Sequence, residues 1–158
     1  MRTRNELETI YLTGHQQHIE ILLRLRKLTR RIVIVQIDGE VKDDPLIVKA
    51  LSMMELISKR QTREWFSTKT FGTHGVEYVF QKKREFFDYL TNYDAFFVSL
   101  PPSEFDRKGY RVEYTDFDPS NDIAFLDENG QLLFYTCTHE GIAMIHPDVM
   151  KADISYLY

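Results

Sequence analysis

The dipeptide Asn129-Gly130 is the feature that most restricts how this chain can fold. It lies between two short apolar segments, and both residues tolerate the positive φ angles that a two-residue hairpin turn needs. We therefore expect residues 122–126 and 131–138 to form an antiparallel hairpin. His139-Glu140-Gly141 indicates a second reversal before residues 141–146, so the C-terminal part is predicted to be a three-stranded antiparallel meander.

Further strands are predicted from runs of β-branched and aromatic residues. Residues 32–37, Ile-Val-Ile-Val-Gln-Ile, are bounded by the turn signal Asp38-Gly39 and should form a mostly buried strand of the same sheet. Residues 95–100 and 110–117 have a similar composition. We expect them to be strands as well.

Helices are predicted where apolar residues recur at helical spacing. The first spans about residues 6–29, either as one helix weakened at Gly14 or as two short helices. The second begins after Asp44, an N-cap residue followed by proline, and runs to about Trp65 or Phe66. The third covers about residues 77–92, and residues 67–75 are expected to be a loop.

Helices ahead of strands indicate an α+β fold. We expect N-terminal helices packed on a mainly antiparallel sheet with a C-terminal three-stranded meander, in a single domain of residues 1–158. Hydrophobic residues make up 43% of the chain at a net charge of −4, which is too apolar for a disordered protein. The fold should therefore form around one core.

The same composition indicates a cytoplasmic protein. Apolar runs last only a few residues, far short of the roughly 20 needed to cross a bilayer, so no membrane association is expected. No secretory signal pattern follows Met1, and the single Cys137 cannot form an internal disulfide.

A metal site is one candidate for chemistry. His139, Glu140 and His146 form an H-E-x5-H pattern, which lacks the spacing of a helical zinc-protease motif but could converge on a small polar site across a hairpin. Asp122 is a further candidate for this site. The set supports an alternative function, a small metal-assisted hydrolase.

Two other patterns carry less chemistry. His15 and His18 share a helix face, yet a third metal ligand is not specified, and a solvated face is the expected arrangement. Cys137 lies two residues before His139, but free cysteine is usually buried and we expect a core role. The chain lacks the glycine-rich phosphate loops and the nucleophile elbow, so no cofactor is expected.

An acidic, aromatic segment is the leading candidate for an interaction surface. Residues 99–128 hold eight Asp and Glu against three Arg and Lys. Aromatic side chains supply interface area and acidic groups steer a basic partner, so another protein is the expected partner. The alternative is that the aromatic side chains belong to the core. The candidate binding residues are Glu104, Phe105, Tyr110, Tyr114, Asp116 and Asp118.

Nucleic acid is a second class of partner that the sequence leaves open. Cations are concentrated in Arg24–Arg31, at the end of the first predicted helix, where they could contact phosphates. Leucines are interleaved with them, as in any amphipathic helix, and cations are favoured at a helix C-terminus by the macrodipole. A structural role for these cations is therefore the first expectation.

The closing segments of the chain suggest a class of function. Asp122-Ile-Ala-Phe, Asn129-Gly130, Leu133-Phe134-Tyr135 and His139-Glu140-Gly141 resemble the closing strands of small bacterial domains, some of them toxin-immunity proteins. The resemblance covers fewer than thirty residues, and no site residue is carried over from it. Since no catalytic constellation is complete, the leading hypothesis is a non-enzymatic macromolecule-binding protein of a bacterium or phage, of immunity or anti-defence type.

Overall fold

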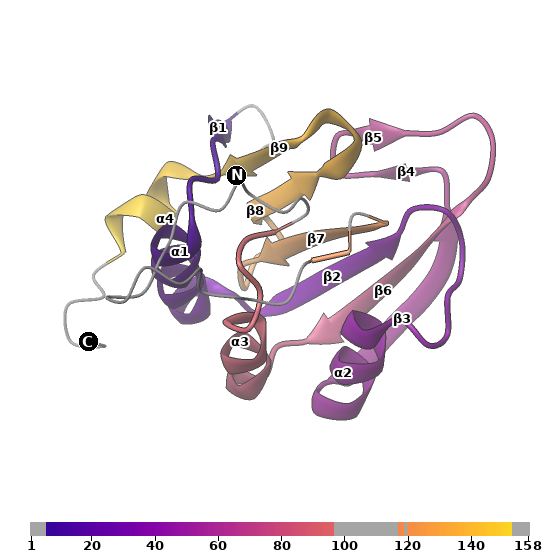
Figure 1. Cartoon of the computed structure of the whole chain (residues 1–158), viewed down its shortest axis with the longest axis horizontal. Coiled ribbons are helices and arrows are strands. Elements are labelled where there is room, and N and C mark those ends of the chain that lie inside the picture. The colour runs from indigo at the N-terminus through magenta and orange to yellow at the C-terminus, as the bar shows by residue number, and fades with distance from the viewer. Residues whose placement is uncertain (1–5, 97–116, 119, 153–158) are drawn as a thin grey trace, which may run out of the picture.

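The chain places a layer of helices on one face of an antiparallel sheet (Figure 1). The structure is a computed structural model that describes residues 6–96, 117–118 and 120–152. The helical elements are α1 (His15–Leu28), α2 (Pro45–Met53), α3 (Arg84–Leu90), the 3-10 turn η2 (Thr138–Glu140) and α4 (Pro147–Lys151). The strands are β1 (Glu8–Ile10), β2 (Arg31–Gln36), β3 (Glu55–Thr62), β4 (Glu64–Trp65), β5 (Thr68–Lys69), β6 (Gly75–Gln81), β7 (Asn121–Leu126), β8 (Leu132–Cys137) and β9 (Ile142–Ile145).

Strand β2 lies inside the main sheet, between β6 and β7. The order of its seven strands is β1-β9-β8-β7-β2-β6-β3, and every recorded pair is antiparallel. Val33 of β2 stands opposite Val79 of β6 on one side and Ala124 of β7 on the other. The β-branched run of β2 suits a strand that is buried on both faces.

The turn between β7 and β8 forms where the sequence predicts it. Gly130 adopts a positive φ of 75°, and its amide donates to the carbonyl of Asp127 at 3.0 Å. The Asp127 carboxylate also accepts from the amides of Asn129 and Gln131. This side chain therefore stabilises the reversal from within, as aspartate commonly does in turns.

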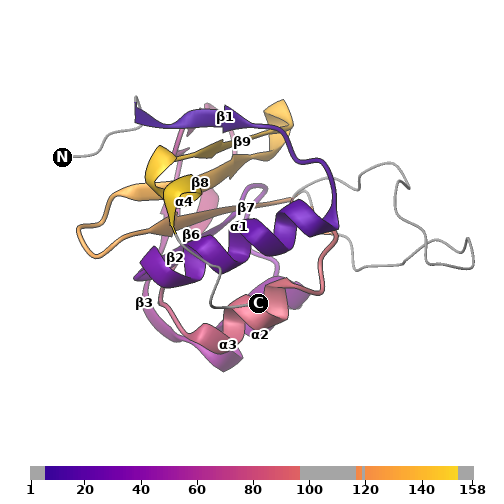
Figure 2. The ribbon, with the colours of Figure 1, turned by 90° about the vertical axis from the view of Figure 1, so that its left-hand side faces the viewer.

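The larger core lies between the sheet and its helices (Figure 2). Helix α3 contacts both α1 and α2, and α1 also contacts α4. Aromatic side chains fill the centre: Phe96 lies within 6.0 Å, ring centroid to centroid, of Phe117, Phe125 and Phe134. Alternation along the strands directs Tyr78 and Phe80 of β6 into the same layer.

A smaller apolar cluster covers part of the opposite face of the sheet. It is built on Val33, Val35, Ala124 and Tyr135, and the β4–β5 hairpin lays Trp65 over it. A β-bulge between Phe125 and Leu126 changes the register of β8, so Leu133 joins the larger core instead of this cluster.

The mixed α+β class is confirmed, but the helices do not precede the strands. The predicted helix over residues 6–29 is wrong in its first half, because residues 8–10 form β1 and pair with β9. The helix begins only at His15, after Gly14. Helix α2 has the predicted Asp44 cap, whose side chain accepts from the amide of Leu46, but it ends at Met53.

The remaining part of that predicted helix is β3, and much of the third predicted helix is β6. The two strands pair with each other in antiparallel register, from Glu55 opposite Gln81 to Thr62 opposite Gly75. This pairing outweighs the local helical spacing of their apolar residues. Only Arg84–Leu90 is helical within residues 77–92. Residues 67–75 contain the short β5, followed by a loop.

The predicted strands at 32–37, 122–126, 131–138 and 141–146 correspond to β2, β7, β8 and β9. Ala95 and Phe96 are buried but do not lie in a strand. The rest of the predicted strand 95–100 and residues 110–116 lie outside the described residues. Among the described helices, none has the length and apolar character needed to cross a membrane.

Candidate functional site

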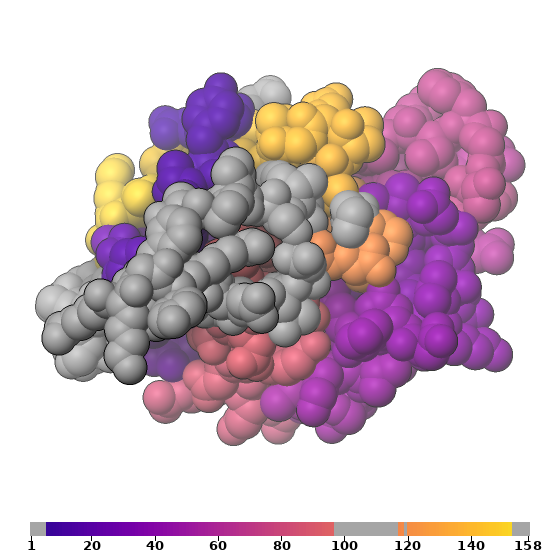
Figure 3. All heavy atoms as spheres, viewed as in Figure 1, coloured from indigo at the N-terminus to yellow at the C-terminus, as the bar shows by residue number. Residues whose placement is uncertain are grey.

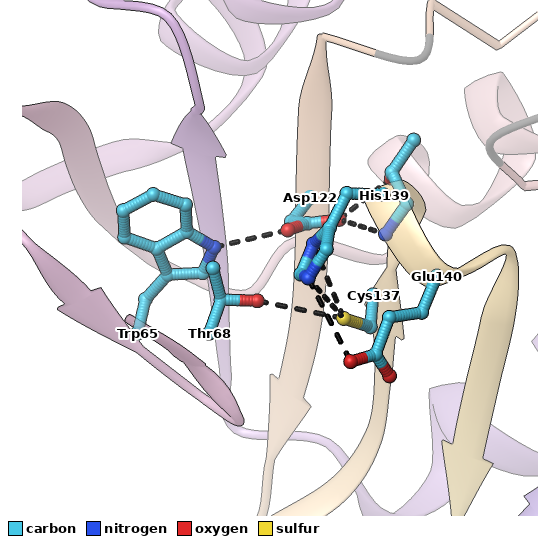
Figure 4. A network of polar contacts seen from close by, with 7 residues as sticks. Trp65, Thr68, Asp122, Cys137, His139 and Glu140 are labelled. Carbon is cyan, nitrogen blue, oxygen red and sulfur yellow. Dashed lines mark hydrogen bonds and ion pairs between the residues drawn. The ribbon is translucent and has the colours of Figure 1, made fainter. Parts of the chain in front are cut away.

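Three groups able to bind a metal meet at the turn between β8 and β9 (Figure 4). Cys137 ends β8, and His139 and Glu140 follow in η2, which closes at Gly141 in the left-handed conformation with φ 66°. The Cys137 Sγ lies 3.5 Å from Nδ1 and 3.9 Å from Nε2 of His139. The His139 Nε2 lies 3.7 Å from the Glu140 Oε1.

A buried carboxylate fixes the backbone that carries these groups. Asp122 Oδ1 accepts from the amide of Thr138 at 2.9 Å, from its hydroxyl at 2.6 Å and from the Thr136 hydroxyl at 3.1 Å. Asp122 has no exposed surface, so these hydrogen bonds are made away from water. Because an unpaired buried carboxylate would be costly, they hold the start of η2 in one position.

The β4–β5 hairpin reaches the same place from the other side of the cluster. The Trp65 Nε1 donates to the Asp122 Oδ2 at 2.9 Å, and the Thr68 hydroxyl lies 3.5 Å from the Cys137 Sγ. Figure 4 shows the Trp65 and Thr68 side chains pointing from the hairpin toward Asp122 and Cys137. The site is therefore assembled from β7, β8, η2 and the hairpin.

The side chains differ strongly in exposure. Cys137 is 1% exposed, whereas about half of the His139 side chain and more than half of the Glu140 side chain are open to solvent. Burial raises the pKa of the Cys137 thiol; the hydrogen bond from Thr68 opposes this and the charge of Glu140 adds to it. A raised pKa favours the neutral thiol, which is a weaker nucleophile than the thiolate.

His146 is not brought to this cluster. It follows the last residue of β9, whereas His139 and Glu140 precede the first, so the strand Ile142–Ile145 separates them. The His146 Nδ1 accepts from the amide of Asp148 at 3.0 Å and caps α4, and its Nε2 lies 3.2 Å from the Glu6 Oε2. His139 and Glu140 are therefore grouped with Cys137, and His146 lies beyond the other end of β9.

His15 and His18 do not form a solvated pair. His18 is 1% exposed, its Nε2 contacts the Leu90 carbonyl at 2.9 Å, and its ring packs edge-on against Phe96. The Nδ1 of His15 lies 3.3 Å from the Asp94 carbonyl. The two rings therefore join α1 to the end of α3 and to the segment that follows it.

The acidic, aromatic surface can be followed at one residue only. Glu104, Phe105, Tyr110, Tyr114 and Asp116 lie outside the described residues. Asp118 is exposed, and its carboxylate accepts from the amide and the hydroxyl of Ser120, as in an ordinary Asx turn. Neighbouring Phe117 is buried against Tyr93 and Phe96 in the larger core.

The cations of Arg24–Arg31 are partly used within the fold. Arg24 donates to the carbonyls of Met150 and Ala152 at the end of α4. A cavity of about 330 Å³ lies beside Lys27 and Arg30, and Asp127 and Glu128 line it too. Acids therefore interrupt the positive surface that a phosphate backbone would need.

The sequence patterns did not single out β3, which forms one edge of the sheet. Seven of its eight residues are exposed. Among the described strands it has a neighbour, β6, on one side only. One signal in the sequence could have identified β6: the buried residues Val76, Tyr78 and Phe80 alternate with half-exposed neighbours. Recognising β6 as a strand would also have offered a pairing partner for β3.

Comparison with known proteins adds no assignment: no family model, curated protein or solved structure matches this chain.

Proposed function

We propose that this chain is a protein-binding module that pairs its edge strand β3 with an extended segment of another protein. The observation that supports the proposal is the length and exposure of this edge. An edge strand presents unpaired backbone groups, and a peptide can add to them as a further strand. At the other edge β1 has only three residues, compared with eight in β3.

Exposed apolar side chains lie on β3 and on α2, the helix that precedes it in the chain. Val48 and Leu51 on α2 and Leu56 and Ile57 on β3 are each 38–48% exposed. Apolar groups next to a free backbone edge allow a partner segment to gain both hydrogen bonds and buried surface. We call these four side chains, together with the outer edge of β3, the β3 surface.

The two cations of β3 pair with acidic side chains outside the strand. Lys59 forms an ion pair with Glu40, and the Arg60 Nε lies 2.8 Å from the Glu77 Oε1. Lysines often protect an edge strand by making a neighbouring strand bury a charge. Here both cations are already paired, which weakens that protection and leaves the backbone edge available.

A β-bulge limits the length of the partner segment. The register of β3 against β6 shifts between Leu56 and Ser58, and pairing is regular from Ser58 to Thr62. A regular run of this length accommodates a short extended peptide, with Ile57 at its end as an apolar contact. An immunity or anti-defence role would place such a segment in a toxin or a defence protein.

The test is site-specific photo-crosslinking combined with hydrogen exchange. A photoreactive phenylalanine analogue at Gln61 should crosslink a partner from the cells that make this protein, whereas the same analogue at Tyr11, which is 76% exposed and lies beyond β1, should not. In the purified complex, the amides within residues 58–62 that point away from β6, about every second one, should exchange at least about tenfold more slowly than in the free protein.

Matched substitutions decide whether β3 carries the binding. Ile57→Lys should weaken the complex at least about tenfold, since it places a charge in the apolar contact, while Tyr11→Lys should change the affinity less than about twofold. A partner that leaves the β3 amides unprotected, or binds Ile57→Lys as tightly as the natural protein, contradicts the proposal. Crosslinking only to a second copy of this chain would replace it with self-association.

A further inference from the structure

We propose that Cys137, His139 and Glu140 bind one Zn²⁺ ion, with one coordination position left open. This site lies between β8 and β9, and β8 is four strands away from β3 in the sheet order. The site is therefore independent of the β3 surface. The three ligand atoms come from the residues whose contacts are shown in Figure 4.

The ligand types favour zinc among divalent ions. A thiolate and an imidazole are the ligands that zinc prefers, and Mg²⁺ and Ca²⁺ favour oxygen ligands instead. The thiolate and the carboxylate together carry two negative charges, which balance the charge of the ion. On binding, the Cys137 thiol loses its proton to solvent and a zinc–sulfur bond forms.

The distances fit a tetrahedral ion. With zinc bonds of about 2.3 Å to sulfur and about 2.1 Å to nitrogen and oxygen, tetrahedral geometry separates sulfur from nitrogen by roughly 3.6 Å and nitrogen from oxygen by roughly 3.4 Å. The corresponding separations from the His139 Nε2 are 3.9 Å to the Cys137 Sγ and 3.7 Å to the Glu140 Oε1. All three ligand atoms lie within 4.8 Å of one another.

The remaining adjustment falls on side chains that can move. His139 and Glu140 are half-exposed or more and can approach the buried sulfur without disturbing the core. The Thr68 hydroxyl is placed to donate to the thiolate, and Asp122 holds the Thr138 backbone between the ligands. Such outer contacts orient the ligands of zinc sites.

The experiment is a titration of the full-length protein with zinc against a chromophoric chelator, with cobalt as a spectroscopic probe. We expect one ion per chain. We also expect a near-ultraviolet thiolate-to-cobalt charge-transfer band that is absent in Cys137→Ser. Because His139 is exposed, His139→Asn should keep the fold, and it should lower zinc affinity at least about 100-fold.

Two control variants separate this site from other histidines. His74→Asn and His146→Asn should bind zinc as the natural protein does, and circular dichroism establishes that each variant is folded. The absence of stoichiometric zinc, a cobalt complex without the thiolate band, or unchanged affinity in His139→Asn would each overturn the proposal. Loss of binding in a folded His146→Asn would also overturn it, because His146 would then be a ligand.

Discussion

At the scale of single residues, His18 shows how burial sets the charge of a titratable group. Its ring extends from α1 to the Leu90 carbonyl. Desolvation by burial lowers the pKa of this ring from 6.5 to about 4. A carbonyl can only accept, so Nε2 carries the proton, and the buried Nδ1 has no hydrogen-bond partner among the described residues. A second proton on this ring would therefore be buried without a partner.

This arrangement predicts that the protein loses stability in mild acid. As pH falls, the unfolded chain binds a proton at His18 near pH 6.5, whereas the folded chain binds it only near pH 4. The free energy of unfolding is therefore unaffected by protonation of His18 above pH 6.5 and decreases as pH falls from 6.5 to about 4. The total loss should be about 3 kcal/mol of unfolding free energy, measured by urea denaturation at several pH values.

The substitution His18→Gln isolates this contribution. A glutamine amide can donate to the Leu90 carbonyl but does not titrate, so the variant should show a flatter dependence of stability on pH between 6.5 and 4. The same slope in the variant and the natural protein would show that other groups cause the acid sensitivity.

At the scale of elements, the sequence predicted strands better than helices. Local sequence determines the strand conformation of the β-branched run in β2 and the turn at Asn129-Gly130. The strands β2, β7, β8 and β9 accordingly formed where expected. Residues 55–62 did not: Ile57 fits the helical spacing of α2, yet it lies in β3, the strand that pairs with β6. That pairing joins residues far apart in the chain, so local periodicity could not reveal it.

The candidate metal site was predictable only where its residues are close together in the sequence. Cys137, His139 and Glu140 are neighbours in sequence, and the turn η2 brings the His139 ring to the Cys137 sulfur. His146 was grouped with them from the sequence, but the length of β9 separates it from η2, and its side chain caps α4. The Asp122–Trp65 hydrogen bond could not be foreseen, because residues around Trp65 were expected to be helical.

The contact between the β4–β5 hairpin and the sheet gives an element-scale prediction. A Cβ atom at Gly75 would lie 2.9 Å from the Trp65 Cζ3 and 3.2 Å from the Val35 Cγ1. Gly75→Ala should therefore push Trp65 outward and destabilise the protein by about 1–3 kcal/mol, with a red-shifted Trp65 fluorescence in the folded state.

Gly72→Ala is the matched control for this change. A Cβ at Gly72 meets no atom within 4 Å, so this variant should differ from the natural protein by less than about 0.5 kcal/mol. Equal stability of the two variants, measured by urea denaturation, would contradict the close packing of Trp65 on β6.

At the scale of the whole molecule, β2 joins parts of the chain that are distant in sequence. It pairs with β6 from the first half and with β7 from the C-terminal part, and the helices of both cores pack across these strands. The Asp122–Trp65 hydrogen bond ties the β4–β5 hairpin to β7 in the same way. Separation of any one part would therefore expose the surfaces of the others.

We accordingly expect the chain to unfold as one cooperative unit. Trp65 is the only tryptophan, so its fluorescence reports on the hairpin, while far-ultraviolet circular dichroism reports on the sheet and helices. The two urea transitions should coincide, and calorimetry should give a van't Hoff enthalpy equal to the measured one, roughly 110 kcal/mol near 60 °C for a chain of this length. If the fluorescence transition came first, the hairpin would be a separate, weaker unit. The Thr68 contact to Cys137 would then be lost before the sheet unfolds, and the zinc site would depend on the hairpin's own stability.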